Sequence, residues 1–375
     1  MTHHCIVIGR GLAGLSLARE LQNSGLRVTV VAPEKSAGDA SRSAQGIASV
    51  KGLLYGRGDL FRAKLEGHRF LGGWLGDVAR ESGMDVPFNL TGAWEPMDSE
   101  GSFRAVRERV YKLSWSGAFA AITKPFPNQM FKTSDGSAFG YAFRHPYDGW
   151  VDVPRLLFAL ETVILKNGGE MNPSYVKGIE KLGAKGWRVV LDGGALDCDE
   201  LFIAAGWGAN RVTEDLGFRF KSKQVPGGTL QWQGLRSGQG AYLFGKRSFV
   251  SDYFGTWKFG SIDTKAPPST ISEQSSLIAA LKAECMQHLS LSVEALNSAS
   301  LNWGIRLCAH DLLPIVGTIG FETGHLLFVS CAFHKSGLQL APMAARKLVE
   351  MFRGQETPPH WRSFDPKRKG LIRPI

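Results

Sequence analysis

The chain has 375 residues, of which 43% are hydrophobic and 21% are charged. This length accommodates one large domain or two interleaved domains with real cores, and the composition excludes a disordered or fibrous protein. No apolar run is long enough to span a bilayer, and the N-terminus lacks the pattern of a secretory signal. We therefore expect a cytoplasmic protein without a membrane partner.

The cysteines and the net charge give information on the compartment of the protein and on the kind of substrate it can bind. The five cysteines are scattered and never form a CxxC pair, which favours a reducing compartment, and no His or Cys spacing predicts a metal site. The formal net charge is +10, with the basic residues spread along the chain rather than gathered in one block. This charge is typical of a soluble surface, and it also suits an anionic substrate such as an amino acid or a nucleic acid.

The N-terminal segment has the pattern of a dinucleotide-binding unit. Residues 4–8 form a short apolar run that predicts a strand, and Gly9, Gly11 and Gly14 follow it at the spacing GxGxxG. Apolar residues at helical spacing come next, and residues 27–31 predict a second strand. A strand, a glycine loop, a helix and a strand within about 30 residues match the size of such a unit.

Two later stretches have a similar organisation. Residues 152–166 predict an amphipathic helix, alternating strands follow it, and the buried run 201–206 ends in glycine. Nearer the C-terminus, a predicted strand at 326–330 precedes a helix from about 338 to 353. The tail from 353 to 375 is rich in proline and basic residues, and we expect it to lie on the surface.

These three units predict one discontinuous domain, and the stretches between them predict a second. The Rossmann-like domain comprises residues 1–50, 145–220 and 305–375, and the second domain comprises residues 51–144 and 221–304. The second set is rich in tryptophan and in β-favouring segments, which is typical of a mainly antiparallel α+β domain. We therefore predict an α/β fold in which a substrate domain is inserted twice into a Rossmann-like domain.

The glycine loop is the first candidate binding site. Gly11 lets the backbone approach a pyrophosphate, Gly14 allows close packing of helix against strand, and the helix N-terminus offers free N–H groups to the phosphates. An acidic residue is expected at the end of the second strand to hold the ribose, but Ala32 stands there. Glu34 either reaches the ribose instead or is an exposed loop residue.

Further motifs follow the glycine loop along the chain. They are Ser41–Gly46 (SRSAQG), Gly149–Pro154 (GWVDVP), Val176, Ala204–Gly206 (AAG), Trp303–Arg306 (WGIR), Asp311–Gly317 (DLLPIVG) and Ala332–Pro342 (AFHKSGLQLAP). In this order they resemble the D-amino-acid oxidase superfamily of FAD enzymes, near the glycine and sarcosine oxidases. The pair Gln45-Gly46 is also similar to the flavin domain of the bifunctional enzyme that completes methylaminomethyl groups on tRNA wobble uridines.

The resemblance implies non-covalently bound FAD, so the Rossmann-like domain becomes an FAD-binding domain. Backbone N–H groups at a helix N-terminus around Gly337 and Leu338 are expected to stabilise negative charge on the reduced flavin ring. The residues implied as cofactor-binding are Gly9, Gly11, Leu12, Ala13, Gly14, Glu34, Arg42, Ser43, Gln45, Gly46, Val176, Ala205, Gly206, Trp207, His334, Lys335, Ser336, Gly337 and Leu338.

Three basic residues are implied in catalysis. In the family, the arginine at the position of Arg306 binds the substrate carboxylate, for which its planar fork is suited, although a structural ion pair is the alternative. Lys335 is expected to assist Arg306 or the flavin, or to be an exposed lysine. Lys258 is a candidate for promoting the reaction of reduced flavin with oxygen, and His334 is expected to form a wall of the pocket.

The sequence thus predicts an FAD-dependent oxidoreductase that acts on CH–NH or CH–NH2 groups of a small anionic or zwitterionic amine. Hydride is expected to pass from the carbon next to nitrogen to flavin N5, followed by hydrolysis of the imine. Three alternatives remain open at this point. One is processing of a carboxymethylaminomethyl group on a tRNA wobble uridine, and another is oxidation of a side chain on a partner protein. The third is a flavin-binding protein without turnover, with Ala32 as a sign of lost function.

Overall fold

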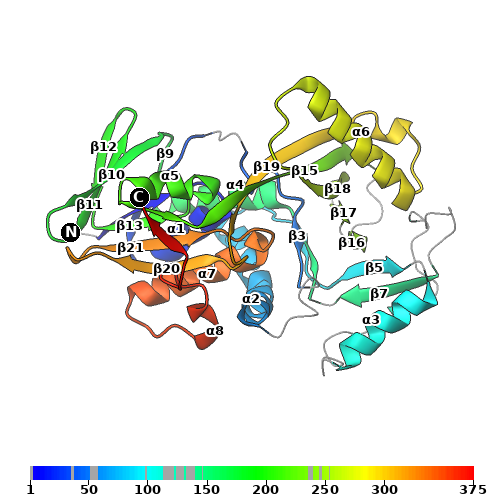
Figure 1. Cartoon of the computed structure of the whole chain (residues 1–375), viewed down its shortest axis with the longest axis horizontal. Helices are drawn as coiled ribbons and strands as arrows, with labels where there is room; N and C mark the ends of the chain where they lie inside the picture. Colours follow the sequence, from blue (N-terminus) through cyan, green and yellow to red (C-terminus); the bar gives the residue numbers. More distant parts are fainter. Residues whose placement is uncertain are drawn as a thin grey trace.

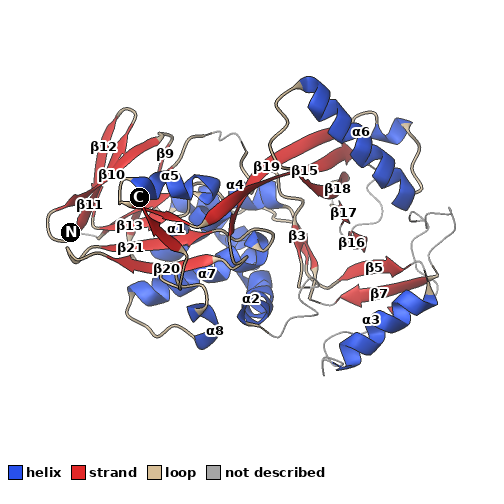
Figure 2. Ribbon diagram, viewed as in Figure 1, coloured by secondary structure: helices blue, strands red, loops and turns tan. Residues whose placement is uncertain are grey.

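The computed structural model places two large sheets at opposite ends of the molecule, with helices packed around each (Figure 1). Strands β15 and β19 extend from the region of one sheet into the other (Figure 2). The structure describes residues 3–34, 38–50, 58–97, 99–112, 122–123, 131, 140–145, 147–234, 240–244, 247–252 and 254–375.

The first sheet has six strands in the order β20-β21-β13-β1-β2-β9, and all of its pairs are parallel except that of β20 with β21. All five residues of β1 are buried, as expected of a strand covered on both faces. The strands are β1 His4–Ile8, β2 Arg27–Val31, β9 Glu170–Asn172, β13 Glu200–Ile203, β20 Ile315–Gly320 and β21 Leu326–Cys331.

Four helices share a hydrophobic core with this sheet. They are α1 Leu12–Gln22, α2 Asp59–Ser82, α4 Val153–Lys166 and α7 Gly337–Phe352. The start of α4 is fixed by Asp152, whose carboxylate accepts a hydrogen bond from the Arg155 N–H at 3.1 Å, and by Pro154 in the first turn. Strand β9 follows α4 closely in the chain and forms one edge of the sheet, so the packing of α4 sets where β9 lies.

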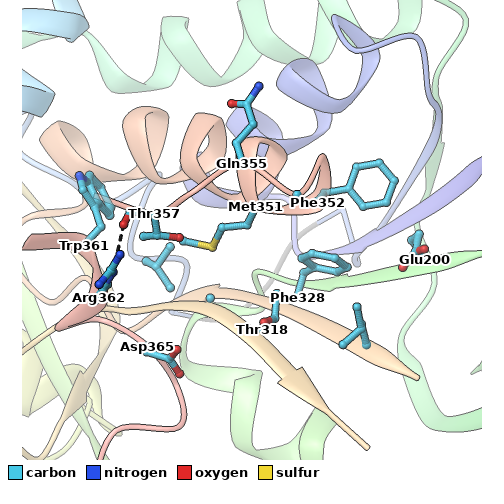
Figure 3. Close-up of a pocket in the computed structure, with 14 residues that line it drawn as sticks. Glu200, Thr318, Phe328, Met351, Phe352, Gln355, Thr357, Trp361, Arg362 and Asp365 are labelled. Carbon is cyan, nitrogen blue, oxygen red and sulfur yellow. Dashed lines mark hydrogen bonds between the residues drawn. The ribbon is translucent and has the colours of Figure 1, made fainter. Parts of the chain in front are cut away.

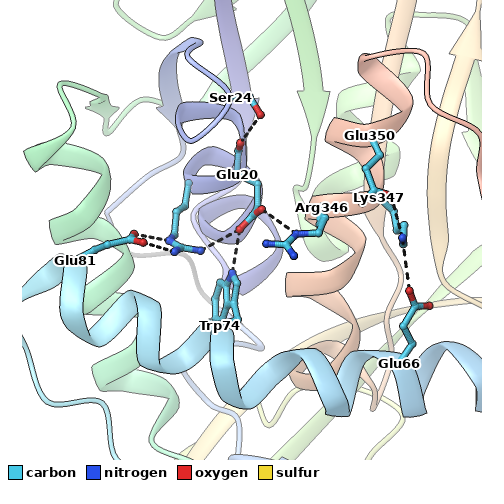
Figure 4. A network of polar contacts seen from close by, with 9 residues as sticks. Glu20, Ser24, Glu66, Trp74, Glu81, Arg346, Lys347 and Glu350 are labelled. Carbon is cyan, nitrogen blue, oxygen red and sulfur yellow. Dashed lines mark hydrogen bonds and ion pairs between the residues drawn. The ribbon is translucent and has the colours of Figure 1, made fainter.

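A buried polar network joins α1, α2 and α7 (Figure 4). Arg19 donates to Glu81 at 2.7 and 2.5 Å, and Glu20 accepts from the Trp74 indole at 3.2 Å. Arg346 approaches Glu20 to 3.5 Å. Charged groups this deep are tolerated when each one has partners, so the network fixes how the three helices pack.

The second sheet has eight strands in the order β19-β15-β18-β17-β16-β5-β7-β6, antiparallel except for the pair β16 with β5. Helix α6 Ile271–His288 packs on one face over an aromatic cluster that includes Trp232, Phe249 and Trp257. The strands are β5 Ala93–Met97, β6 Ile122–Thr123, β7 Tyr141–His145, β15 Ser222–Gln233, β16 Gly240–Phe244, β17 Arg247–Ser251, β18 Thr256–Asp263 and β19 Ser300–Ala309.

Smaller elements complete the fold. Three short sheets have the strand orders β10-β11-β12, β3-β8-β4 and β14-β22. Their strands are β3 Ile47–Ala48, β4 Phe88–Asn89, β8 Gly149–Val151, β10 Val176–Leu182, β11 Gly186–Leu191, β12 Gly194–Cys198, β14 Phe218–Phe220 and β22 Ile372–Pro374. The remaining helices are α3 Glu100–Lys112, η2 Gly206–Gly208, α5 Ala209–Glu214, η3 Glu294–Leu296 and α8 Pro359–Arg362.

The C-terminal tail differs from the prediction. Trp361, Phe364 and Leu371 are at most 1% exposed, and β22 pairs with β14. Trp361 and Phe364 belong to the same hydrophobic core as α1 and α7. The expectation of a surface tail was therefore wrong, because these three apolar side chains anchor a segment whose composition is otherwise polar and basic.

Candidate active site

The glycine loop brings the start of α1 against the end of β1. Gly9 has a φ of +124°, and a Cβ at this position would lie 2.3 Å from the Ala204 carbonyl oxygen. A Cβ at Gly14 would lie 1.9 Å from the Gly9 carbonyl oxygen. Helix α1 begins after Gly11 without a side-chain cap from that residue. This close approach and a helix N-terminus whose own cap residue has no side chain fit the pyrophosphate of FAD.

A second loop lies against the first turn of α1. Leu12 and Ala13 form that turn, and the Leu12 N–H donates to Ser41 Oγ at 3.0 Å. Asp39 in turn accepts from the Ser41 N–H at 2.8 Å, which shapes the loop as a tight turn. The helix start predicted to hold the phosphates is therefore bordered by the loop predicted to pass the flavin.

A charged cluster lies beside the glycine loop. Arg10 donates to both carboxylate oxygens of Glu161, at 2.8 and 2.9 Å, and Arg42 donates to the same carboxylate at 3.0 Å. The hydrogen bond to Glu161 raises the pKa of Arg10, and Glu34 adds to this through its charge. Glu34 is exposed, so the structure places it near the loop but shows no hydrogen bond that would orient it toward a ribose.

Ser43 and Gln45 contact the second sheet. The Ser43 hydroxyl donates to the Trp303 carbonyl oxygen. The Gln45 amide donates to the carbonyl oxygens of Ser248, at 2.7 Å, and Lys258, at 3.1 Å. The Ser248 hydroxyl donates back to Gln45 at 2.6 Å. These hydrogen bonds hold the loop against the sheet and occupy both side chains. The predicted contact of Ser43 and Gln45 with the cofactor is therefore expected from their backbone atoms.

The remaining predicted cofactor residues lie at strand ends. Gly46 has a φ of +93°, and a Cβ there would lie 2.3 Å from the Val151 carbonyl oxygen. Val176 begins β10 and is half-buried, while Ala205 follows the last strand residue of β13 by two positions. Gly206, with a φ of +55°, and Trp207 form η2 directly after it. Parallel strands β1 and β13 pair, so Ala205, Gly206 and Trp207 lie at the same sheet edge as the glycine loop.

The loop before α7 contains unusual backbone conformations. His334 has a φ of +51°, a region that residues with a side chain rarely adopt. Helix α7 begins at Gly337 after Ser336, which makes no side-chain cap. Within the described part of the chain, the buried amide Nε2 of Gln339 in the first turn has no hydrogen-bond partner. The N–H groups around Gly337 and Leu338 therefore remain suited to an anionic ligand.

Both loops contact strand β19 along the edge that is not paired with β15. The Ile305 N–H donates to the Gly38 carbonyl oxygen at 2.9 Å. Further along the same edge, Cys308 forms an isolated bridge with Phe333. Arg306 stands between these two contacts, so the predicted carboxylate-binding residue lies where the loop near α1 and the loop before α7 both meet the second sheet.

Arg306 and Lys335 converge on one carboxylate, and we call Arg306, Asp263 and Lys335 the ion cluster. Arg306 Nη2 donates to Asp263 Oδ1, and Lys335 Nζ lies 2.8 Å from Asp263 Oδ2. Asp263 and Arg306 face each other across Gly227 of β15, where a Cβ would lie 2.2 Å from Arg306 Nη2. The glycine lets the guanidinium cross the strand. The ion pair that the sequence left open for Arg306 is thus present.

The ion cluster shifts the pKa of the groups around it. Burial disfavours the charged form of Asp263, but hydrogen bonds and charge from Lys335 and Arg306 outweigh it and hold its pKa below the ordinary value. For His334, burial and then the charges of Arg306 and Lys335 lower the pKa to about 4. His334 is therefore a neutral ring near pH 7, which suits the predicted wall of the pocket.

Lys258 is buried, with 6% of its surface exposed. Its neighbours on β18, Trp257 and Phe259, face the aromatic cluster under α6, so Lys258 points from the opposite face of the sheet. Burial lowers its pKa, while the negative charges of Asp152 and Asp252 oppose that shift. The lysine is therefore a buried side chain with two carboxylates in its surroundings.

Sequence reasoning missed three residues that organise this site. Asp263 was not singled out, although it ends the strand that contains Lys258. Arg10 lies inside the glycine loop, where a charged residue is a visible signal, but its partner Glu161 is 151 positions away. Such pairings depend on which helix and strand faces meet, and a single sequence carries no direct signal for them.

One pocket of about 390 Å³ lies away from these residues (Figure 3). It is bordered by β20, β21, the end of α7 and α8, with Thr318, Phe328, Met351 and Trp361 in its lining. None of the predicted site residues is among those described in its lining. Among the residues that the structure describes, no group of three or more His, Cys, Asp or Glu side chains is arranged to hold a metal ion. No described helix is long and apolar enough to cross a membrane.

Known proteins resemble the chain over almost its whole length. A glycine oxidase of Pseudomonas aeruginosa is 24% identical over 380 residues, covering 95% of this chain and 96% of the relative. The crystal structure of glycine oxidase from Geobacillus kaustophilus superposes with a TM-score of 0.80 at 18% identity, covering 98% of this chain and 99% of that one. Iminodiacetate oxidase from Chelativorans gives a TM-score of 0.78 at 16% identity, covering 96% and 98%.

The fold of L-amino acid deaminase from Proteus myxofaciens is also similar, with a TM-score of 0.76 at 16% identity and coverage of 98% and 94%. These matches confirm the predicted fold class of a parallel FAD-binding sheet with a second, mainly antiparallel domain. The family model described as DAO, FAD dependent oxidoreductase, matches residues 4–351. The chain therefore belongs to the DAO family of FAD-dependent oxidoreductases, as the sequence motifs predicted, and is an amino-acid-oxidase-like enzyme.

Proposed function

We propose that the enzyme oxidises a small amine that carries one carboxylate, such as an amino acid. The observation that carries this proposal is that Arg306 and Lys335, from separate elements, hold a single carboxylate in the ion cluster. When bound, FAD supplies at N5 the acceptor for a hydride from the carbon next to nitrogen, and water then hydrolyses the imine. Two of the relatives named above act, by their names, on glycine and on L-amino acids, and a third acts on iminodiacetate, an amine with two carboxylates.

Arg306 is the proposed carboxylate-binding residue. Its side chain is 15% exposed, so its charge interacts strongly with a bound anion, and its planar fork matches a carboxylate. Lys335, at 51% exposure, is a weaker partner because solvent screens its charge. Binding the carboxylate at β19 would place the amine of a small amino acid toward the loop before α7, because that loop contacts β19 at Cys308.

The start of α7 is the proposed site for stabilising negative charge. Backbone N–H groups around Gly337 and Leu338 point from a helix N-terminus whose cap residue makes no side-chain hydrogen bond. The neutral ring of His334 beside them excludes water without adding a charge. The buried Gln339 amide, which lacks a partner among described residues, offers a further donor.

Lys258 remains a proposed catalytic residue for oxygen reactivity. It is buried on the sheet face opposite the α6 cluster, and its backbone carbonyl is fixed by Gln45. Asp152 and Asp252 oppose the effect of burial on its pKa and so favour the charged form that this role requires. The proposal fails for this residue if Lys258→Met reacts with oxygen as fast as the parent enzyme.

The domain division also remains a proposal. The strands of the parallel sheet come from the three segments 1–50, 145–220 and 305–375, and those of the eight-stranded sheet come mostly from 51–144 and 221–304. Helix α2 is an exception, because it packs in the core of α1, α4 and α7. We propose that α2 belongs with the FAD-binding domain in spite of its place in the chain.

The proposal is tested by mixing the purified enzyme with amines in the absence of oxygen. We expect a yellow protein whose FAD is released on denaturation and whose flavin absorbance is bleached by at least one amino acid. Decarboxylated analogues of the same amine should bleach it much more slowly. A protein that stays colourless after incubation with FAD would contradict the proposed function, and equal bleaching by both kinds of amine would contradict the role of Arg306.

A further inference from the structure

The ion cluster contains a carboxylate of the chain itself at the place proposed for the substrate. Asp263 Oδ1 accepts from Arg306 Nη2, and Asp263 Oδ2 lies 2.8 Å from Lys335 Nζ. A guanidinium can bind a carboxylate through two parallel hydrogen bonds, but here at least one of its N–H groups is already used. A substrate carboxylate therefore has to compete with Asp263 for the N–H groups of Arg306.

The charges of the ion cluster determine how many anions it accepts. Arg306 and Lys335 contribute two positive charges and Asp263 one negative charge, so the sum over the ion cluster is +1, and Lys223 outside the cluster adds a positive charge with the smallest effect of those that act on His334. The adjacent His334 is uncharged near pH 7 because its pKa is lowered to about 4. One substrate carboxylate brings the sum to zero, whereas a dicarboxylate leaves an uncompensated negative charge in a half-buried place.

The exposure of the three side chains indicates which contact yields to a substrate. Arg306 is 15% exposed, whereas Asp263 is 40% and Lys335 is 51% exposed. Displacing the carboxylate and the ammonium toward solvent would therefore expose less buried surface than displacing the guanidinium. Lys335 would keep Asp263 as its partner, and the freed N–H groups of Arg306 would bind the incoming carboxylate.

We propose that Asp263 is a specificity-determining residue, which competes with the substrate carboxylate for Arg306 and restricts the site to substrates with one carboxylate. This inference rests on the proposed function, because it assumes that substrate binds at Arg306. It concerns binding, so it can be measured with carboxylates that the enzyme does not oxidise.

The experiment compares the FAD-loaded parent enzyme with Asp263→Asn, which keeps the shape of the side chain and removes its charge. Acetate, malonate and acetamide are titrated, and binding is followed through the change in flavin absorbance. Asp197→Asn serves as the matched control, because Asp197 also pairs with an arginine, Arg188, but lies 47% exposed on the β11–β12 hairpin. Melting temperature and FAD content establish that each variant is folded.

We expect Asp263→Asn to bind acetate on the order of tenfold more tightly, since one competing charge-assisted contact is removed. The affinity for malonate should rise more than that for acetate, because the cluster of the variant carries two positive charges. The affinity for acetamide should not change. The control variant Asp197→Asn should change each dissociation constant by less than about twofold. Unchanged or weaker acetate binding by Asp263→Asn would overturn the inference, and equal gains for acetate and malonate would overturn the restriction to one carboxylate.

A second variant tests the same idea if Asp263→Asn does not fold. Lys335→Gln leaves Arg306 as the remaining partner of Asp263 in the ion cluster, so acetate should bind more weakly, and adding Asp263→Asn should restore binding. For turnover, the KM of a carboxylated amine should fall in Asp263→Asn by a larger factor than kcat changes. If no carboxylate binds even the parent enzyme, the proposed function itself fails. If the parent binds acetate and neither variant behaves as expected, the role of Asp263 alone fails.

Discussion

Arg306 reaches Asp263 because glycine stands at position 227, and the same geometry allows it to turn toward a ligand. A guanidinium stays charged and presents a planar fork, whereas a lysine ammonium presents one point charge on a flexible stem. The contribution of Arg306 to a bound carboxylate should therefore depend on its shape as well as its charge. This dependence separates a binding role from a structural ion pair, which a lysine can partly replace.

We predict that Arg306→Lys impairs turnover of a carboxylated amine while leaving FAD binding intact. The lost charge-assisted hydrogen bonds correspond to about 1.5–3 kcal/mol, or roughly tenfold to a hundredfold in kcat/KM. Steady-state kinetics and a flavin titration on the same preparation provide both values. If the variant loses FAD or fails to fold while the KM of the substrate is unaltered, Arg306 serves the structure only.

The lowered pKa of His334 makes the stability of the folded protein depend on pH, with a sign that can be worked out. Its pKa is about 4 in the folded protein and near the ordinary 6.5 in the unfolded chain. Between these values the unfolded chain binds a proton that the folded protein does not, so this residue costs stability as the pH falls from 6.5 toward 4. Above pH 6.5 both states are neutral at this position, and the effect disappears.

We predict that His334→Asn loses less stability on acidification than the parent enzyme. Asparagine does not titrate and tolerates the left-handed backbone found at φ +51°. The difference is at most about 3 kcal/mol, and solvent at the half-buried ring reduces it. Urea unfolding near neutral pH and at acidic pH measures it, with the exposed His310→Asn as the control. Equal losses in His334→Asn and the parent would mean that His334 titrates normally.

The pairing of Asp263 with Arg306 could not be predicted from the sequence. Asp263 lies 43 positions from Arg306, and the two meet because β15 pairs with both β18 and β19 in a particular register. A shift of that register by one residue would move Asp263 to the other face. Arg306 itself could be predicted, because a family motif surrounds it, whereas no local pattern marks its partner.

At the scale of elements, the glycine loop joins β1 to α1 with almost no free space. The Gly14 position lies so close to the Gly9 carbonyl oxygen, at 1.9 Å from an added Cβ, that even a methyl group displaces the helix. Any displacement moves the N–H groups of the first turn away from the edge where β1 and β13 end together. Cofactor affinity should therefore be sensitive to this one position.

We predict that Gly14→Ala weakens FAD binding at least tenfold and lowers the free energy of unfolding by about 1–3 kcal/mol through overpacking. Gly76→Ala is the matched control, since nothing lies within 4 Å of a Cβ there and the residue is exposed on α2. The control should be stabilised by up to about 1 kcal/mol through better helix propensity. FAD titration and thermal unfolding test both variants, and unchanged FAD affinity in Gly14→Ala would exclude the phosphate-binding role.

Elements with a regular apolar pattern were predictable, and buried side chains outside such a pattern were not. The strands at 4–8 and 27–31 and the helix at 153–166 agree with the sequence prediction within one residue, because apolar spacing there is dominated by one buried face or by burial on both faces. In the tail, Trp361 and Phe364 are buried within a stretch rich in proline and charge. Anchors of that kind leave no periodicity, so composition alone indicated a surface segment.

At the scale of the whole molecule, loops near α1 and before α7 reach the eight-stranded sheet where the site is proposed. Loop contacts from Gly38 and from Phe333 both reach β19, and the ion cluster lies at that junction. Because three separated segments build the first sheet, its arrangement depends on contacts that are distant in sequence. The predicted domain division assigns α2 to the second domain, and no sequence signal showed that α2 packs with α4 and α7, since these partners lie far along the chain.

The net charge of +10 bears on the size of the substrate. A polyanion such as tRNA would engage many surface cations, whereas an amino acid would engage one or two charges within the site. We predict that substrate affinity falls only slightly as salt rises, since charges within the site lie closer than the screening distance of about 8 Å at physiological salt. A tRNA substrate would instead give a log–log slope that grows by about one for each phosphate contact. Flavin reduction by an amino acid, measured over a range of salt concentrations, provides the slope, with tRNA binding measured in the same buffers. Micromolar tRNA binding that collapses as salt rises, without flavin reduction by any amino acid, would overturn the small-amine proposal.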